Sequence, residues 1–323
     1  MEQSLNRKIL EILKSEPTEY VSGESLCEIL GVSRTAVWKH IETLRSLGYV
    51  IEAFPHRGYR LVEAPDKLLA EELSHALQTK VIGKAIFFHE IVSSTNDLAY
   101  ALAEKGAGEG AVVVADEQTK GKGRLGRTWM SPKGSGVYLS VILRPALSPQ
   151  SVPKVTLFAA LAAARAVRKI TGVTAQIRWP NDLLIGGKKI AGVLTEMSGE
   201  QDRVHFVIVG IGINVNTSAE RIPKEGTSLK IETGKEVSRI MLTRALLEEL
   251  DALYRQFTDG ENGEPLEECR KLSSVLGTHV MVEQASGRKE GYAIDIDDEG
   301  ALLLRLDDGF TARILSGDLV KLR

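Results

Sequence analysis

The spacing of apolar residues predicts three helices and a hairpin in the first 64 residues. The stretch "LNRKILEILKS" has apolar residues at helical spacing, and "SGESLCEIL" is a second short helix that ends at Gly31. A third helix begins after Ser33 as its N-cap. Its buried stripe contains Ala36, Val37, Ile41, Leu44 and Leu47. The strands "YVIEAF" and "YRLV" then flank the turn "PHRG", which completes the pattern of a winged helix-turn-helix domain over residues 1–64.

From about residue 81 the pattern changes to a mixture of strands and helices. Apolar strands are predicted in "KAIFFHEIV", "GAVVVADEQ", "VYLSVILRP" and "VHFVIVGIGINV". Helices are predicted in "SSTNDLAYALAEKG", "KVTLFAALAAARAVRKITG" and "SRIMLTRALLEELDALYRQF", and a hairpin turns at Gly186-Gly187. Because hairpins outnumber strand–helix–strand crossovers, we expect a mixed α/β domain over residues 65–270, with Pro65 in the linker before it.

The last fifty residues alternate apolar and polar positions between turns that contain glycine. Strands this short and regularly spaced predict a small β-barrel or an open sandwich over residues 271–323. The predicted fold class is therefore a multidomain α+β protein.

The amino-acid composition narrows the class of protein further. Hydrophobic residues make up 43% of the 323 residues and charged residues 26%, as in an ordinary globular protein. No apolar run approaches the roughly 20 residues of a membrane helix, and "MEQSLNRKILEILKSE" lacks a signal-peptide core. The two cysteines, Cys27 and Cys269, are far apart, which predicts neither a disulfide framework nor a zinc site. We expect a cytoplasmic protein without a membrane partner.

Net charge limits how the first domain could bind DNA. The whole chain carries −2, and residues 1–64 contain eight basic and nine acidic residues. Bulk attraction is absent, so the basic residues would have to share one face. The third helix and the wing offer such a face, although a solvated face in a protein-interaction winged helix is the alternative. The candidate DNA-binding residues are Ser33, Arg34, Thr35, Trp38, Lys39, His40, Arg45, His56, Arg57 and Arg60.

The stretch "KGKGRLGRTW", residues 120–129, resembles two nucleotide-binding fingerprints at once. Both fingerprints require a helix directly after the glycines, but Pro132, Gly134 and Gly136 follow, and the next element is a strand. Residues 120–127 hold four cations, three glycines and no acid. An anion-binding loop for a polyphosphate or an adenylate is therefore favoured over a basic surface hairpin.

Three other stretches offer polar groups to a ligand. In "RWPNDLL" a rigid turn presents Asn181 and Asp182, close in sequence to the pair Lys188-Lys189, of which only one lysine can face a site. The glycines before Asn214 in "VIVGIGINVN" suit close approach of a ligand to the backbone. In "SSTNDL", the first interpretation is that Ser94 or Thr95 is the N-cap of a helix.

Taken in order, "SSTN…DEQTKGKGRLGRTW…RWPNDLLI…GKKIAGVLTE…GIGINVN" resembles the biotin–protein ligase family. The N-terminal "SRTAVWKHIETLRSLGYVIEAFPHRGYRL" resembles the winged helix of its bifunctional members, which also repress biotin genes. The resemblance covers essentially the whole chain. It implies a ligase domain similar to class II aminoacyl-tRNA synthetases and a C-terminal SH3-like β-barrel.

The implied reaction has two steps. Biotin and ATP, with Mg²⁺, give biotinyl-AMP and pyrophosphate, and a lysine of a biotin carboxyl carrier protein of a carboxylase then takes the biotinyl group. The implied partners are this carrier, operator DNA and a second copy of the chain in a ligand-promoted homodimer. A ligand-sensing transcription factor without activity and a lipoate-type ligase are the alternatives.

The resemblance also assigns roles to residues. The implied catalytic residues are Lys189, Asp182 and Arg124, with Asp182 also a possible Mg²⁺ ligand. The implied biotin-binding residues are Ser94, Thr95, Asn96, Gln118, Lys122, Gly123, Arg124 and Lys189. The implied adenylate-binding residues are Arg124, Arg127, Trp129, Asn181 and Asn214. The chain departs from the family pattern at Lys122 and Arg178, where the family has arginine and lysine, and both departures keep the charge. Lysine at position 122 gives up bidentate geometry, so the details of anion contact change there.

Overall fold

A computed structural model describes residues 2–284 and 287–320 of the chain. The chain divides into two compact units, Met1–Leu77 and Gln78–Arg323. Within the described ranges, no helix combines the length and apolarity needed to cross a membrane. Cys27 and Cys269 are both free thiols.

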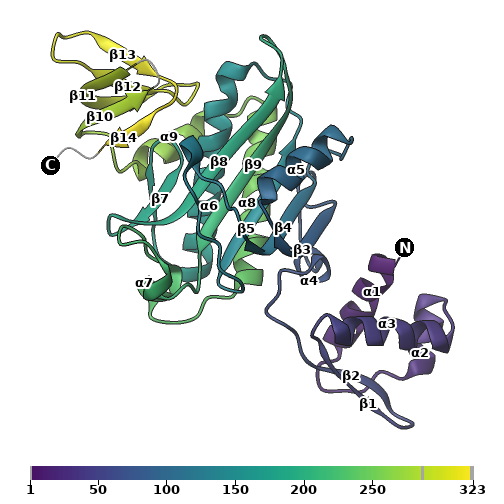
Figure 1. The fold of residues 1–323 in the computed structure, drawn as a ribbon. Coiled ribbons are helices and arrows are strands. Elements are labelled where there is room, and N and C mark those ends of the chain that lie inside the picture. The colour runs from purple at the N-terminus through teal and green to yellow at the C-terminus, as the bar shows by residue number, and fades with distance from the viewer. Residues whose placement is uncertain (1, 285–286, 321–323) are drawn as a thin grey trace. The chain divides into compact units, whose positions relative to one another are not determined.

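The first unit has the predicted winged helix-turn-helix order (Figure 1). Ser22 and Ser33 cap the second and third helices through their hydroxyls, and Gly31 ends the second helix in the left-handed conformation. The core of the unit is formed by Ile9, Leu13, Leu26, Val37, Ile41 and Leu44. Its elements are α1 (Glu2–Ser15), α2 (Gly23–Leu30), α3 (Arg34–Ser46), the antiparallel strands β1 (Val50–Phe54) and β2 (Gly58–Glu63), and α4 (Ala70–Ser74).

The segment after Pro65, where the sequence predicts a linker, packs with the first unit. Glu72 of α4 is 3% exposed. Lys14 Nζ of α1 and the Tyr49 hydroxyl each donate to its carboxylate, both at 2.7 Å. A buried carboxylate needs such partners, so this contact fixes α4 on α1.

The second unit is built on a seven-stranded sheet in the order β3-β4-β5-β9-β8-β7-β6. Only β3 and β4 pair in parallel, and every other neighbouring pair is antiparallel. The mixed sheet predicted from the hairpins is therefore confirmed. The strands are β3 (Ile86–Val92), β4 (Val112–Gln118), β5 (Gly136–Leu143), β6 (Gln176–Arg178), β7 (Asp182–Ile185), β8 (Lys188–Gly199) and β9 (Val204–Asn214).

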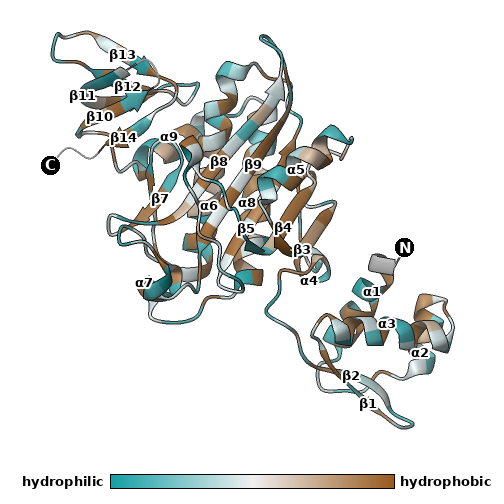
Figure 2. Cartoon of the chain, in the orientation of Figure 1, coloured by the Kyte–Doolittle hydropathy of each residue, from teal (hydrophilic) through white to brown (hydrophobic). Residues whose placement is uncertain are grey.

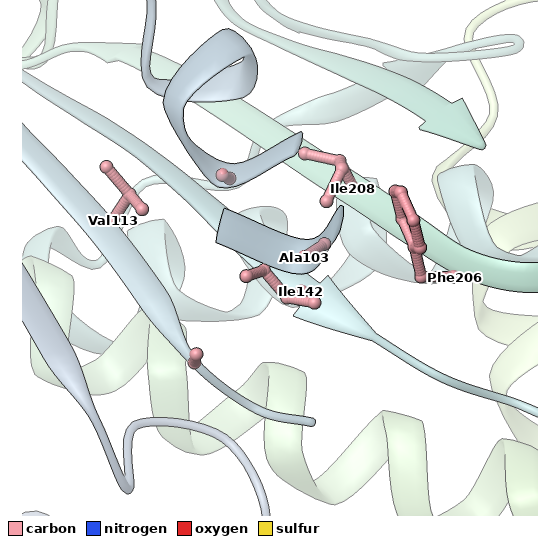
Figure 3. Packing of buried hydrophobic residues seen from close by; sticks show 7 residues of the cluster. Ala103, Val113, Ile142, Phe206 and Ile208 are labelled. Atoms are coloured by element: carbon pink, nitrogen blue, oxygen red, sulfur yellow. The ribbon is translucent and has the colours of Figure 1, made fainter. Parts of the chain in front are cut away.

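Helices cover both faces of this sheet, and side chains alternate between them along each strand. Ile142 of β5 and Ile208 of β9 pack with Ala103 under α5 (Thr95–Glu104), as Figure 3 shows. Their neighbours Val141 and Val209 point to the opposite face, which α6 (Val152–Thr171) and α8 (Arg239–Thr258) cover. Strands buried on both sides explain the long apolar runs, which are brown along β4 and β9 in Figure 2.

Buried contacts of α8 hold parts of the second unit together. An ion pair between Arg239 and Asp116 at 2.7 Å ties α8 to β4. Asp251 of α8 accepts backbone N–H bonds from Lys80, Val81 and Ile82 and so holds the segment that enters the sheet. The remaining helices are the 3₁₀ turns Arg124–Gly126, Pro149–Ser151 and Ala219–Arg221, with α7 (Leu229–Thr233) and α9 (Gly263–Leu272).

The C-terminal strands form a five-stranded antiparallel sheet in the order β13-β12-β11-β10-β14. In the described part of the chain its edge strands do not pair with each other, so the predicted closed SH3-like barrel is not confirmed; residues 285–286 and 321–323 of that prediction lie outside the described ranges. Trp179 Nε1, between β6 and β7, donates to Gly300 O at 3.0 Å and so fixes this sheet to the seven-stranded one. The strands are β10 (His279–Gln284), β11 (Gly287–Ile296), β12 (Leu302–Arg305), β13 (Thr311–Ile314) and β14 (Asp318–Val320).

Candidate active site

A cavity opens where the side chains on one face of β9 become small. Phe206 and Ile208 fill the space under α5, but the next positions on the same face are Gly210 and Gly212. A Cβ at Gly210 would lie 2.0 Å from Asn96 Oδ1, and one at Gly212 would lie 2.4 Å from Trp129 Nε1. The cavity and its open mouth together contain about 910 Å³ of empty space. Its floor therefore exists because these two positions lack side chains.

A hydrogen-bonded cluster at the start of α5 forms one wall of the cavity. Gln118 Oε1 accepts from Thr95 N at 2.8 Å, and Gln118 Nε2 donates to Ser131 Oγ at 2.8 Å. Ser140 Oγ of β5 lies 2.8 Å from Thr95 Oγ1 and 2.6 Å from Asn96 Oδ1. Buried polar groups locked in this way present a fixed pattern of donors and acceptors to a ligand.

Ser94 occupies the N-cap position of α5, but its side chain makes no capping hydrogen bond. It is buried and lines the cavity. The interpretation of this serine as a helix cap is therefore wrong for its hydroxyl, which is left available to a ligand.

The glycine stretch 120–129 folds as a narrow hairpin over the cavity. Gly123 N donates to Arg127 O at 2.7 Å, and Trp129 N donates to Gly121 O at 2.8 Å. A Cβ at Gly121 would lie 2.3 Å from Trp129 O, so this position requires glycine. The glycines lead into a single 3₁₀ turn and then an extended segment. The absence of a following helix, which excluded the dinucleotide and P-loop interpretations, is confirmed.

Each of three cations of the hairpin contacts a different element. Lys122 pairs with Asp97 of α5, and this hydrogen bond raises the pKa of Lys122. Arg124 donates to Asn181 Oδ1 at 3.2 Å. Burial lowers the pKa of Arg124, and the nearby Asp182 partly offsets this effect. Arg127 pairs with Asp318 of β14, so the hairpin is tied to the C-terminal sheet as well.

The turn "RWPND" aims a carboxylate at the lysine of the next strand. Asp182 Oδ1 lies 2.6 Å from Lys189 Nζ, and its Oδ2 accepts from Arg178 at 2.6 Å. Lys189 lines the cavity, whereas Lys188 is exposed. The expectation that only one of the two lysines faces the site is therefore confirmed.

A β-bulge re-aims Lys189. In a regular strand Lys189 and Gly192 would point to opposite faces because they are three residues apart. The register between β7 and β8 shifts here: Leu184 pairs with Lys189 while Leu183 pairs with Ala191. Ile190 is the extra residue, so Lys189 joins Gly192 on the cavity face, and a Cβ at Gly192 would lie 3.3 Å from Lys189 Nζ.

Trp129 lies between the hairpin and the floor. Its ring centroid is 5.3 Å from Lys189 Nζ, and its indole lies against Gly212. Among the described residues its Nε1 has no hydrogen-bond partner although it is buried. A buried donor without a partner at a cavity wall is suited to a ligand acceptor.

The predicted ligand-binding residues lie together with one exception. Ser94, Thr95, Asn96, Gln118, Lys122, Gly123, Arg124, Arg127, Trp129, Asn181, Asp182 and Lys189 all line the cavity. Asn214 does not line it, because its Nδ2 donates to Thr227 O at 3.1 Å. The sequence did not predict that Arg178, Ser131, Ser140, Asp318 and Leu319 belong to the site or its wall. The alternation of side chains along β5 could have indicated Ser140. No local pattern indicates the residues of β14.

The predicted DNA-binding residues lie on the first unit. Arg34, Thr35, Trp38 and Lys39 are exposed on α3, and Arg57 is exposed on the wing. Their side chains therefore form a polar surface with one aromatic residue, which a nucleic acid could contact.

Several of these candidates also hold the fold of the first unit, among them Arg45, which donates to Ile51 O at 2.6 Å. Ser33 serves as the N-cap of α3, accepting from Ala36 N at 3.2 Å. His40 is half-buried, with Nδ1 2.8 Å from Asn6 Oδ1. Their structural contacts leave the exposed residues of α3 and the wing as the stronger candidates for direct contact.

Within the described ranges, no group of three His, Cys, Asp or Glu side chains could hold a metal ion. Asp182 is a poor metal ligand in this arrangement because each of its oxygens is already paired with a cation. The site offers fixed donors, a basic hairpin and a lysine–aspartate pair, which suits charge stabilisation at a bound anion.

Family models match three parts of the chain. The biotin/lipoate A/B protein ligase family matches residues 88–214, an HTH domain matches residues 6–60, and a biotin protein ligase C terminal domain matches residues 275–322. These matches define the class of protein: a ligase-type domain follows a helix-turn-helix domain and precedes the C-terminal domain of biotin protein ligases.

Individual relatives match most of the chain or all of it. The bifunctional ligase/repressor BirA of Bacillus subtilis (strain 168) is 41% identical over 325 residues and covers 99% of both chains. BirA of Escherichia coli (strain K12) is 32% identical over 306 residues, covering 93% of this chain and 92% of its own. The biotin protein ligase from Aquifex aeolicus in complex with biotin and ATP matches with TM-score 0.63 at 31% identity, over 73% of this chain and 98% of that one. The chain belongs to the family of bifunctional biotin ligase/repressors.

Proposed function

We propose that the chain is an ATP-dependent biotin–protein ligase that also represses biotin genes. In the first step a carboxylate oxygen of biotin attacks the α-phosphate of ATP, and the bond to pyrophosphate breaks, giving biotinyl-5′-AMP. In the second step the amine of a carrier lysine attacks the acyl carbon, AMP leaves, and an amide forms. The substrate supplies the nucleophile in both steps, so catalysis needs positioning and charge stabilisation rather than a protein nucleophile.

The position of Lys189 carries this proposal. Its ammonium lies 2.6 Å from Asp182, and Lys189 lines the same cavity as the polar wall at α5 and the basic hairpin. In the proposed complex Lys189 contacts the carboxylate of biotin and then the acyl-phosphate linkage, and Asp182 orients it. Developing negative charge at that point is where a fixed cation lowers the barrier most.

The residues of the wall would bind biotin, and most residues of the hairpin would bind the nucleotide. Ser94, Thr95, Asn96 and Gln118 would hydrogen-bond the ureido ring of biotin, and Gly123 and Lys122 would close over it. Arg124, Arg127, Trp129 and Asn181 would contact the nucleotide, with Arg124 supplying a planar fork for phosphate oxygens. Asn214 would reach the adenylate only after releasing Thr227 O.

Mg²⁺ is proposed only as the companion of ATP, bound mainly by its phosphates. The paired carboxylate of Asp182 does not fit the role of a protein ligand to the ion. The proposed acceptor is a biotin carboxyl carrier protein, and the proposed compartment is the cytoplasm.

The ligase proposal is tested by product analysis. The purified chain is incubated with ATP, biotin and a biotin carboxyl carrier domain, and the carrier is examined by mass spectrometry. We expect one biotinyl group on one lysine, none without ATP, and none on a carrier in which that lysine is replaced. An unmodified carrier, with biotin bound to the chain, would favour a ligand sensor instead.

The repressor proposal rests on the exposed polar face of α3. We expect Lys39→Ala to weaken operator binding about tenfold and to reduce its salt dependence, whereas Lys8→Ala on α1, also exposed, should change neither. Equal effects of the two substitutions in a titration at several salt concentrations would place the DNA surface elsewhere.

We further propose a ligand-promoted homodimer, because ligand occupancy would then set the population that can bind two half-sites. Analytical ultracentrifugation should show tighter self-association with biotinyl-AMP than without it. Equal association constants in the two samples would exclude this form of regulation.

A further inference from the structure

Residues 225–227, far from Lys189 in the sequence, hold both of its backbone hydrogen-bonding groups. Lys189 N donates to Glu225 O at 2.9 Å, and Thr227 N donates to Lys189 O at 2.8 Å. We propose that this segment is a positioning element for the reaction, acting through Lys189. The inference rests on the proposed ligase function.

Residues 225–227 pair with β8 at Lys189, where β9 no longer does. β9 pairs with β8 from Ala191 onward, where Ala191 lies opposite Ile213. At Lys189 one edge of β8 pairs with Leu184 of β7, and the other edge pairs in parallel with Gly226. The backbone of Lys189 is therefore fixed on both sides.

This support matters because Lys189 adjoins the bulge at Ile190. A bulge disrupts the local ladder and lets the strand twist, so the direction of the neighbouring side chain depends on whatever bonds remain. Here that direction brings Lys189 Nζ within 2.6 Å of Asp182 and 5.3 Å of the Trp129 ring centroid. Loss of the bonds to 225–227 would free the backbone to rotate and move the ammonium away from the reacting atoms.

The segment is itself anchored rather than loose. Thr227 is 1% exposed, and its hydroxyl donates to Glu232 Oε1 at 2.6 Å. Asn214 Nδ2, at the end of β9, donates to Thr227 O at 3.1 Å. Contacts thus connect the end of β9, through Asn214 and Thr227, to the backbone of Lys189. Asn214 therefore helps to anchor residues 225–227, a role separate from the proposed contact with the adenylate.

Gly226 has no room for a side chain. A Cβ there would lie 2.6 Å from Ile222 Cγ2 and 3.2 Å from Pro223 O. Gly226→Ala therefore forces Ile222 or the segment itself to shift, and Thr227→Pro removes the N–H that bonds Lys189 O. Gly108→Ala is the matched control, because a Cβ at Gly108 meets nothing within 4 Å.

The test is a double-mutant cycle on the full chain, with the dissociation constant of biotinyl-AMP and the split between kcat and KM for biotin as readouts. We expect Thr227→Pro and Gly226→Ala each to weaken biotinyl-AMP binding about tenfold with Lys189 present, and less than about twofold in the Lys189→Met background. In the Lys189 background kcat should fall by a larger factor than KM for biotin rises, because the wall at α5 is untouched.

Equal effects in the two backgrounds, or no effect of either substitution, would overturn the positioning role. If Thr227→Pro no longer unfolds cooperatively, Gly226→Ala alone decides between these outcomes. If the wild-type chain neither forms nor binds biotinyl-AMP, the proposed ligase function fails instead, so the two failures are distinguishable.

Discussion

The floor of the cavity and the hairpin that covers it are both rich in glycine, but the glycines serve different purposes. On the floor, a Cβ at Gly210 or Gly212 would collide with Asn96 or Trp129. At the base of the hairpin a Cβ at Gly121 would also collide, with Trp129 O, but nearer the tip a Cβ at Gly123 would lie 3.3 Å from its nearest neighbour, Arg127 O, and one at Gly126 would meet nothing within 4 Å. The floor is defined by space, whereas the tip of the hairpin has room and is tied to its surroundings by its cations.

This difference predicts how each region tolerates change. A buried floor of interlocked polar groups should fail sharply when one group is altered or one methyl group is added. Exposed ion pairs contribute little individually, so the hairpin should weaken gradually. Substitutions in the two regions, and at the lysine between them, should therefore differ widely in their effects.

Lys189→Met removes the cation at the junction of the two regions and should have the largest effect. We expect the rate of biotinyl-AMP formation to fall by about a hundredfold or more, because one fixed charge-stabilising group is lost. Single-turnover kinetics with ATP and biotin measure this directly. Lys188→Met, on the exposed neighbour, should leave the rate unchanged; a similar loss in both variants would refute the assignment.

Gly212→Ala tests the floor. The added methyl group displaces the Trp129 indole, and overpacking of this kind costs about 1–3 kcal/mol, or roughly five- to 150-fold in biotin affinity. Gly123→Ala in the hairpin should cost less than about threefold because its neighbours need to move only slightly. Calorimetric titration with biotin compares the two, and equal losses would erase the distinction between floor and hairpin.

Arg124→Lys tests the most buried cation of the hairpin. Lysine keeps the charge but cannot form a planar fork, so we expect KM for ATP to rise about tenfold with KM for biotin less affected. Steady-state pyrophosphate release at varied ATP and biotin provides both constants. An unchanged KM for ATP would show that Arg124 serves the hairpin rather than the nucleotide.

Asp318→Asn breaks the pair that ties the hairpin to the C-terminal sheet. We expect biotinyl-AMP to dissociate about threefold faster, because Arg127 is largely exposed and the pair is partly screened. Glu283→Gln is the control, since Glu283 pairs with Arg288 in the same sheet. Stopped-flow release that is identical for both variants would exclude a closing role for β14.

Lys122→Met should have the smallest effect. Its pair with Asp97 is nearly half exposed on both sides, so a change below about threefold in adenylate retention is expected. The double exchange Asp97→Lys with Lys122→Asp should restore the wild-type release rate. A tenfold loss in Lys122→Met that the exchange does not restore would instead indicate direct contact with the ligand.

Much of this site is predictable from sequence because its parts lie in short local patterns. The tight turn at Gly186-Gly187 indicates that only one of two lysines faces the site. The glycines before Asn214 indicate close approach to the backbone, and the groups that approach it are Asn96 and Trp129. The helix-breaking residues after the glycine stretch are enough by themselves to exclude the nucleotide fingerprints. Local geometry, which depends on neighbours in the chain, carries this information.

The rest depends on contacts between distant segments. Alternation along β9 places Asn214 on the same face as Gly210 and Gly212, yet Thr227 O captures its amide. The bulge at Ile190 reverses the alternation that would have aimed Lys189 away from Gly192. Asp318 reaches the hairpin only because the C-terminal sheet is docked through Trp179 and Gly300. None of these contacts follows from a local pattern.

Biotin-dependent exchange of labelled pyrophosphate into ATP tests the central claim most directly, because it reports adenylate formation without a carrier protein. The account predicts exchange with biotin, no exchange with lipoate, and loss of exchange in Lys189→Met. Exchange supported by lipoate, or none with biotin although biotin binds, would contradict it.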